Sequence, residues 1–224
     1  AKQLLFLLLT MRTLPVEKEK LMLFLWPDAE NKVAKRNFKI VLNELTKILE
    51  PDRKPRADSK FIIKQDASLQ LVMNEDCQTD VALFEQYVSS GIRLARTNQE
   101  QAKGTLLTAL SLYEGEYLAG EYLDDLSLRE RDRLQLLALK GGERLAAIFV
   151  EQKDYEKALT WADWILNIDN CWEKAYQLKL QCYGERHDKA LLERVYRQCG
   201  TVLENELGVE PSAETRNLYK KYRI

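Results

Sequence analysis

Residues that bend or break a polypeptide are scarce here, with nine glycines and five prolines in 224 residues. A fold of many short strands needs frequent turn-forming residues, so this scarcity favours long helices. The single histidine, His187, lies in a polar segment (residues 185–188) that we interpret as an exposed turn. No nucleophile-elbow, phosphate-loop, zinc-protease or dinucleotide-binding motif occurs. We therefore predict that the chain is not an enzyme, nominate no catalytic residue, and expect no cofactor.

Cysteines and long apolar runs are also few. The apolar run from Leu4 to Leu9 is too short to span a bilayer and lacks a signal-peptide cleavage site. We expect a cytoplasmic protein with no membrane partner. The cysteines form no Cys-x-x-Cys pair, which favours reduced, buried thiols over disulfides or zinc: Cys77, Cys171, Cys182 and Cys199. An acidic run without interleaved His or Cys is interpreted as solvated surface, not a metal site: Glu114, Glu116, Glu121, Asp124, Asp125 and Glu130.

Charge is distributed unevenly along a chain of otherwise ordinary globular composition. Residues 1–75 carry 14 Lys and Arg against 10 Asp and Glu, an excess of four positive charges. The remaining 20 basic and 25 acidic residues leave an excess of five negative charges. A basic N-terminal part and an acidic C-terminal part indicate two domains with different partners.

The N-terminal part predicts three helices followed by a β-hairpin. We expect helices over residues 2–12 and 17–26, and a longer third helix ending near residue 50 that Asp28 or Asn31 caps. Two β-prone runs, 61–64 and 69–73, fit a hairpin directly after it. In the third helix, apolar residues recur every three or four positions and predict one buried stripe: Ala34, Phe38, Val41, Leu45 and Ile48.

The other side of the third helix is basic, which is typical of a helix-turn-helix whose last helix enters the major groove of DNA. Arg36 could bind a guanine through two hydrogen bonds, and Asn43 could bind an adenine in the same way. The alternative is that a basic stripe opposite a buried face is simply solvated. The candidate DNA-binding residues, including two beside the hairpin, are Lys32, Lys35, Arg36, Lys39, Asn43, Lys47, Lys60 and Lys64.

From Asp80 to the end, the pattern is helical and repetitive. The expected helices cover 80–96, 99–113, 124–151, 155–168, 172–183, 188–206 and 212–222. This rhythm suggests tetratricopeptide-like (TPR-like) repeats, which stack into a solenoid that binds protein segments. One repeat would pair two helices through residues that include small side chains: Leu145, Ala146 and Phe149 with Ala158, Ala162 and Ile165. Aromatic residues in this part could line a ligand groove, but helical spacing favours packing: Tyr155, Trp161, Trp164, Trp172 and Tyr176.

Several short motifs, in order along nearly the whole chain, resemble one family. Residues 206–212 (ELGVEPS), followed by Glu214-Thr215 and Leu218-Tyr219, resemble the end of the bacterial transcriptional activator domain of SARP-type regulators. Residues 109–118 and Glu130-Arg131 resemble its opening helices, and Asp80 with Phe84-Glu85 resembles its start. The N-terminal residues that resemble the OmpR-like winged helix preceding that domain are Leu25 to Ala29, Ala34, Asn37, Leu45 and Leu49.

The resemblance implies a mainly α protein: a truncated winged helix-turn-helix over residues 1–76 and a TPR-like helical domain over 77–224. The truncation refers to the N-terminal strands of such winged helices, which are missing here, and Ser68-Leu69 replaces the usual Gly-Tyr of the hairpin. The implied function is activation of transcription on double-stranded DNA. The implied protein partner is RNA polymerase or a second copy, with a homodimer on DNA.

Two other functions remain open on sequence alone. In the first, the winged helix no longer contacts DNA and the helical domain is a protein-interaction scaffold. In the second, the chain is the effector part of a larger sensor protein. The start at Ala1, without Met and already within an apolar helix, motivates the second alternative.

Overall fold

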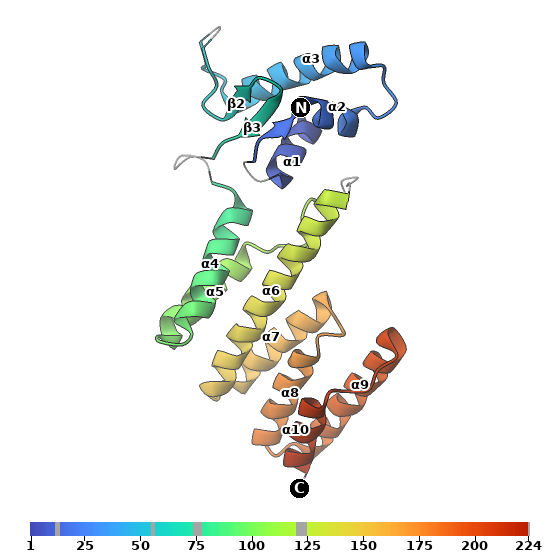
Figure 1. Cartoon of the computed structure of the whole chain (residues 1–224). Coiled ribbons are helices and arrows are strands. Elements are labelled where there is room, and N and C mark those ends of the chain that lie inside the picture. The colour runs from blue at the N-terminus through green and yellow to red at the C-terminus, as the bar shows by residue number, and fades with distance from the viewer. Residues whose placement is uncertain (12–13, 55–56, 74–77, 120–124, 224) are drawn as a thin grey trace. The chain divides into compact units, whose positions relative to one another are not determined.

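The computed structural model of the chain describes residues 1–11, 14–54, 57–73, 78–119 and 125–223 (Figure 1). It separates into two compact units. Unit 1 comprises Ala1–Thr79 with Gly120–Glu130, and unit 2 comprises Asp80–Ala119 with Arg131–Ile224. The predicted boundary between residues 76 and 77 lies outside the described residues, as do Cys77, Glu121 and Asp124.

Unit 1 contains three helices and a small antiparallel sheet. Its elements are α1 (Lys2–Thr10), β1 (Val16–Glu17), α2 (Lys18–Leu25), α3 (Asn31–Leu49), β2 (Ile62–Gln65) and β3 (Ser68–Leu71). The helices and the hairpin agree with the sequence prediction. β1 was not predicted: it pairs with β3, giving the strand order β1-β3-β2. Two residues are too few to show an alternating pattern, but Val16 is buried opposite Leu69.

The core of unit 1 confirms most of the predicted stripe on α3, beginning with the buried Ala34, and corrects its C-terminal end. Phe38 and Leu45 are buried with the leucines of α1 and the sheet, whereas Ile48 is 62% exposed. Thr46, which was not predicted to be buried, is buried, and its hydroxyl donates to the Leu42 carbonyl at 2.7 Å. The residue at the N-cap is Glu30, with no side-chain cap, so the prediction of a cap by Asp28 or Asn31 was wrong.

Unit 2 is a stack of antiparallel helices, as expected from the repeated pattern (Figure 1). None of the helices in the described part of the chain is long and apolar enough to cross a membrane. The elements are α4 (Asp80–Leu94), α5 (Gln99–Ser111), α6 (Asp125–Glu151), α7 (Tyr155–Ile168), α8 (Glu173–Glu185), α9 (Lys189–Leu207) and α10 (Ala213–Arg223). Of α6, residues 125–130 fall in unit 1 and the rest in unit 2. The bounds of these helices agree with the predicted ranges to within a few residues. The protein is therefore mainly α.

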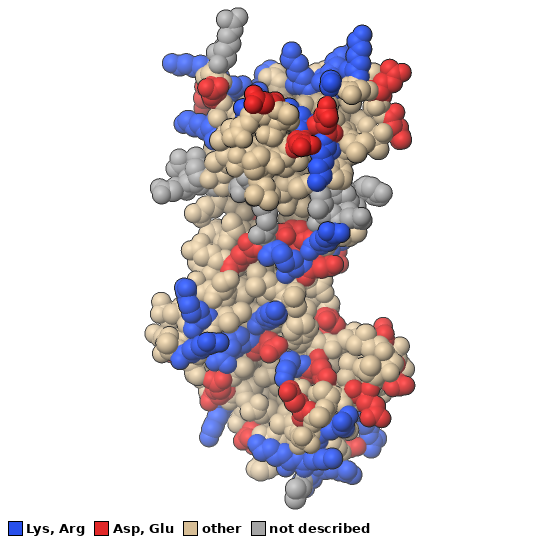
Figure 2. Space-filling view, viewed as in Figure 1, with Lys and Arg blue, Asp and Glu red and all other residues tan. Residues whose placement is uncertain are grey.

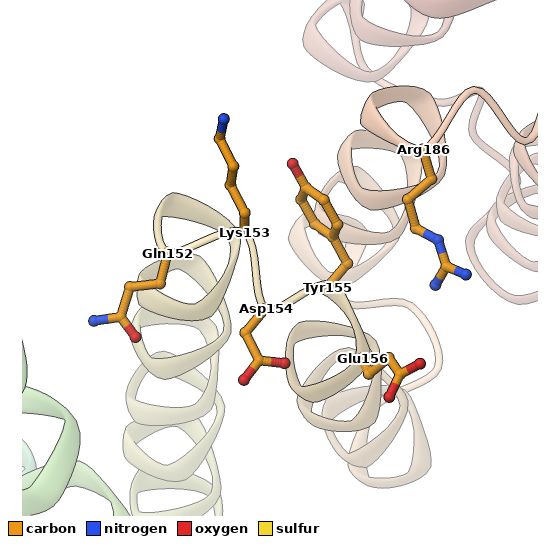
Figure 3. Close-up of a pocket in the computed structure, with 6 residues that line it drawn as sticks. All are labelled: Gln152, Lys153, Asp154, Tyr155, Glu156 and Arg186. Carbon is orange, nitrogen blue, oxygen red and sulfur yellow. The ribbon is translucent and has the colours of Figure 1, made fainter.

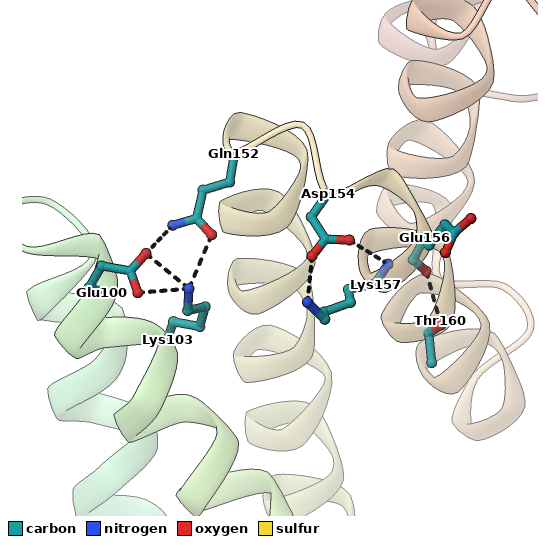
Figure 4. A network of polar contacts seen from close by, with 7 residues as sticks. All are labelled: Glu100, Lys103, Gln152, Asp154, Glu156, Lys157 and Thr160. Carbon is teal, nitrogen blue, oxygen red and sulfur yellow. Dashed lines mark hydrogen bonds and ion pairs between the residues drawn. The ribbon is translucent and has the colours of Figure 1, made fainter.

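Similar turns divide the helices of unit 2 into TPR-like pairs. Asp154 caps α7 by accepting from the Lys157 amide, and Asp188 caps α9 by accepting from the Leu191 amide. These two caps lie 34 residues apart, the length of a tetratricopeptide repeat. Each cap follows a residue in the left-handed conformation, Lys153 or His187. Figure 4 shows the first turn, where Asp154 and Lys157 form an ion pair.

Small and apolar side chains let the helices of each pair approach closely. Ala146 on α6 and Ala158 and Ala162 on α7 are fully buried in one core, as predicted. Two of the predicted thiols, Cys182 and Cys199, are buried, and this burial raises their pKa values to about 11 and about 12. Both thiols therefore stay protonated near neutral pH.

A polar cluster fastens α10 to α8. The Glu173 carboxylate accepts from the Ser212 amide at 2.7 Å and from the Thr215 hydroxyl, and Thr215 is fully buried. The Ser212 hydroxyl in turn accepts from the Thr215 amide, so it caps the start of α10. Ser212 and Thr215, which belong to the C-terminal motifs noted in the sequence, therefore hold α10 against α8.

Candidate nucleic-acid interface

The solvent-facing side of α3 carries the predicted basic residues. Because Ala34, Phe38 and Leu45 point into the core, helix geometry turns the intervening positions outward. All six predicted residues of this helix are exposed: Lys32, Lys35, Arg36, Lys39, Asn43 and Lys47. We call this set the α3 basic face. In Figure 2, Lys and Arg side chains project near α3, with carboxylates among them.

The α3 basic face makes no internal ion pairs. Within the described part of the chain, none of its five cations forms an ion pair or a side-chain hydrogen bond. The exposed carboxylate of α3, Glu44, lies 3.9 Å from the amino group of Ala1 instead. Uncompensated cations on an exposed helix face are available to phosphates, and each contact would release counterions from DNA.

Lys35 differs from the rest of the α3 basic face. It lines a cleft of about 270 Å³ together with residues of β1, α2 and the hairpin turn, including Glu17, Glu19 and Ala67. Carboxylates at the same cleft compete with phosphate for a lysine. The structure therefore places Lys35 at the edge of the basic face, whereas Arg36, Lys39 and Asn43 lie on one side of the helix at three- and four-residue spacing.

The hairpin is fastened to the end of α3 by Glu50. Its carboxylate accepts from the Lys60 amide at 2.8 Å and from the Ser59 hydroxyl. Burial raises the pKa of Glu50, but these hydrogen bonds and the nearby charges of Arg53 and Lys60 outweigh it, and the pKa is lowered. The two candidate DNA-binding lysines beside the hairpin, Lys60 and Lys64, are both exposed. The backbone of Lys60 therefore has a fixed position relative to the C-terminal end of α3.

The turn of the hairpin is held against the start of α2. The Lys18 amide donates to the Ala67 carbonyl at 2.8 Å, and the Lys18 ammonium donates to the Asp66 carbonyl. Asp66 itself has a positive φ of 26° and puts an acidic side chain at the tip. Neither the contact of Lys18 with the hairpin turn nor the position of Ile40, which is 57% exposed among the residues of the α3 basic face, was predicted from the sequence. The signal for Ile40 was its helical position, three residues before Asn43.

Unit 2 offers a second, polar candidate site. An open cleft of about 470 Å³ lies at the α6–α7 turn and the end of α8 (Figure 3). It is lined by side chains of both charge signs: Gln152, Lys153, Asp154, Tyr155, Glu156 and Arg186. Next to it, Gln152 bonds to Glu100 and Lys103 of α5 (Figure 4). No apolar lining or convergent charge of one sign marks this cleft as a site for a particular ligand.

The aromatic residues of unit 2 pack and do not line that cleft, with the exception of Tyr155. Trp161 and Trp164 lie edge to face with ring centres 5.3 Å apart, against the main core. The indole of Trp172 donates to the Glu143 carboxylate at 3.1 Å. Within the described ranges, no group of acidic, His or Cys residues is arranged to hold a metal ion. In the acidic run, Glu116 forms a 2.8 Å ion pair with Arg131.

The fold and these turns define a TPR-like helical domain, which follows a smaller unit of helices and a three-stranded sheet along the chain. Residues 79–223, more than half of the chain, match the family described as bacterial transcriptional activator domain, and the chain belongs to this family. The resemblance stated from the sequence motifs is thereby confirmed for the helical part. No curated protein matches the chain.

The solved structures that are similar to the chain include the following two. One is Mycobacterium tuberculosis EmbR in complex with a low-affinity phosphopeptide, with a TM-score of 0.80 and 19% identity, covering 96% of this chain and 56% of EmbR. The chain thus spans about half the length of that structure. The other is the C-terminal TPR-containing domain of a protein assigned as FK506-binding from Plasmodium falciparum. It has a TM-score of 0.47 and 20% identity, and the match covers 64% of this chain and 90% of that domain. The EmbR match shows that the fold of nearly the whole chain occurs in a known protein.

Proposed function

We propose that the protein is a DNA-binding transcriptional activator in which residues 1–76 form a winged helix and α3 enters the major groove. The observation that carries this proposal is the α3 basic face, whose cations form no ion pair with any other described residue and which is followed by a hairpin fixed to its helix. The order α1-β1-α2-α3-β2-β3, with β1 completing a three-stranded sheet, supports a winged helix.

In this proposal, different residues have different roles on DNA. Lys32, Lys39 and Lys47 neutralise phosphates, while Arg36 and Asn43 reach base edges. Lys60 and Lys64 contact the neighbouring backbone from the hairpin, and Lys35 contributes least because of its acidic neighbours. Membership of the activator-domain family supports a role in transcription.

The helical part, residues 77–224, would provide the protein contacts. A stack of TPR-like pairs presents a continuous surface to a protein segment. We propose RNA polymerase or a second copy of the chain as the partner, with two copies bound together on DNA, in the cytoplasm. The similarity to EmbR supports this proposal only through the fold, because the same two kinds of unit occur together in that structure.

The test is fluorescence anisotropy of a labelled random duplex, titrated at several salt concentrations. With about 4–6 phosphate contacts, the log–log slope of affinity against salt is expected near −4 to −5. The triple variant Arg36→Glu, Lys39→Glu, Lys47→Glu should lose this binding. The matched control Lys153→Glu, Arg186→Glu, Lys220→Glu makes the same change in net charge on exposed residues of unit 2, and should keep most of it.

Equal loss in the two triple variants would mean that net charge, not the α3 basic face, governs binding. Absence of salt-dependent binding in the unaltered chain would overturn the DNA-binding proposal. The protein would then be a scaffold or the effector part of a larger sensor. Pull-down with unit 2 variants, such as those in the polar cleft of Figure 3, would become the relevant experiment.

A further inference from the structure

An exposed isoleucine lies within the α3 basic face. Ile40 is 57% exposed, four residues after Arg36 and three before Asn43. On an α-helix these spacings place the three side chains next to one another on the surface. Single exposed apolar residues are common and need no explanation by themselves. The location of Ile40, between two side chains suited to reading bases, is what gives it significance.

The core of unit 1 does not use Ile40. The buried stripe of α3 lies on the opposite side of the helix, where Phe38 and Leu45 are nearly inaccessible. Val33, seven residues earlier and 46% exposed, continues the line of Ile40 along the axis. The charged face of α3 therefore contains a narrow apolar row in addition to its cations.

A duplex that covers Arg36 and Asn43 must also cover Ile40. Seven residues of α-helix rise by about 10 Å, the length of about three base pairs. Arg36 and Asn43 can satisfy the polar edges of purines, but Ile40 has no polar group. Against most base edges it would remove water from donors and acceptors without replacing their hydrogen bonds, which is unfavourable.

The major groove presents one apolar group among the four bases, the C5 methyl of thymine. We propose that Ile40 contacts the C5 methyl group of a thymine located between the bases contacted by Arg36 and Asn43, and so specifies one base pair of the site. This inference rests on the proposed function, because it requires α3 to lie in the major groove.

The same helix provides a matched control. Ile48 is also an exposed isoleucine, at 62%, but it lies eight residues further along α3. At 100° per residue this rotates it about 80° around the axis, away from the line of Arg36, Ile40 and Asn43. Its replacement should leave thymine recognition unchanged.

The experiment begins by selecting duplexes from a random pool with the 224-residue chain. In the enriched duplex, each thymine is then replaced in turn by deoxyuridine, which differs only by the missing methyl. For the unaltered chain, we expect one position at which this replacement weakens binding by about fourfold, the effect of exposing one methyl-sized group. Ile40→Ala should bind the thymine duplex at least as weakly as the unaltered chain binds the deoxyuridine duplex. Replacing that thymine by deoxyuridine should not weaken the binding of Ile40→Ala further. Ile48→Ala should behave as the unaltered chain.

The outcomes separate this inference from the proposed function. If the chain enriches no duplex and shows no salt-dependent binding, both are overturned. If it binds and the α3 charge-reversal variant does not, but deoxyuridine has the same effect on the unaltered chain and on Ile40→Ala, only the thymine contact is overturned. Circular dichroism melts check the fold of the variant. Alanine at an exposed helical position should preserve it, because alanine has the highest helix propensity.

Discussion

The two units use their basic residues differently. In unit 2, cations are paired between elements: Lys179 of α8 with Asp163 of α7 at 2.5 Å, Lys174 of α8 with Glu214 of α10 at 2.5 Å, and Arg131 of α6 with Glu116 of the preceding loop at 2.8 Å. On α3 of unit 1, the cations are exposed and have no such partners among the described residues. Charge in unit 2 therefore connects helices to one another, whereas the α3 basic face is available to another molecule.

The contrast also explains why a count of charges is a poor guide to function. An excess of four positive charges in the first 75 residues is small. Its effect depends on the side of α3 where the cations gather and on the lack of ion pairs between these cations and other described residues. Paired surface charges contribute little to stability individually, so those of unit 2 mainly fix geometry.

The largest expected effects come from the two cores. Leu45→Ala in unit 1 and Leu180→Ala in unit 2 each remove a fully buried side chain, at a cost of about 2–5 kcal/mol in the free energy of unfolding. Urea unfolding followed by circular dichroism measures both. Only Leu45→Ala should also abolish duplex binding, because it removes the support of the α3 basic face. Duplex binding lost equally in Leu180→Ala would contradict this division of roles.

A smaller loss is expected where α10 meets α8. A Cβ at Gly184 would overlap the ring of Tyr222, so Gly184→Ala should destabilise unit 2 by about 1–3 kcal/mol. The control is Gly104→Ala on α5, where an added Cβ meets nothing within 4 Å. That change should stabilise the helix by up to about 1 kcal/mol. Thermal melts that shift in the same direction for both variants would argue against the close helix contact.

The polar cluster around Glu173 predicts a pH dependence confined to unit 2. Burial raises the pKa of Glu173, but hydrogen bonds from Thr215 and Ser212 and the charge of Lys174 outweigh it, and the pKa lies below its ordinary 4.5. Because the folded pKa is lowered, this carboxylate contributes its full stability above the unfolded pKa and loses it as pH falls through the folded pKa.

Glu173→Gln should therefore have a lower free energy of unfolding than the unaltered chain at pH 7. This difference in free energy should become smaller as the pH falls below 4.5. Urea titrations at several pH values measure this. The control is Glu206→Gln, an exposed carboxylate on α9. If the difference in free energy of unfolding between Glu173→Gln and the unaltered chain stays constant with pH, the cluster does not favour the ionised form of Glu173.

The smallest effect belongs to the hairpin lysines. If Lys64 contacts one phosphate, Lys64→Ala should reduce the salt slope of duplex binding by about one, without changing sequence preference. Lys179→Ala is the matched control from unit 2, because Lys179 is already paired with Asp163. An unchanged slope in Lys64→Ala would confine the contact to α3.

Sequence periodicity predicted the helices well because long amphipathic patterns contain many independent observations. The exposure of Lys32, Arg36 and Asn43 followed from the same pattern. Elements of only one or two residues were harder to predict from the sequence. β1 exists through pairing with β3, which is distant in sequence, and a two-residue strand has no pattern of its own.

Other departures also have physical causes. Ile48 is apolar and in register with the stripe, but it lies in the last turn of α3, where it is exposed. Thr46 is buried because its hydroxyl bonds to the backbone of its own helix. The acidic neighbours of Lys35 come from α2 and the strand before it, so the spacing within α3 could not reveal them.

The strand order β1-β3-β2 leaves β2, like the two-residue β1, at an edge of the sheet. An outer strand can pair with the strand of another molecule, and lysines on such a strand hinder that pairing by repulsion. Lys64 lies on β2, so the residue proposed to attract DNA would also keep protein copies apart. Its removal should lower colloidal stability, and light scattering at high concentration would reveal β-sheet-mediated aggregates.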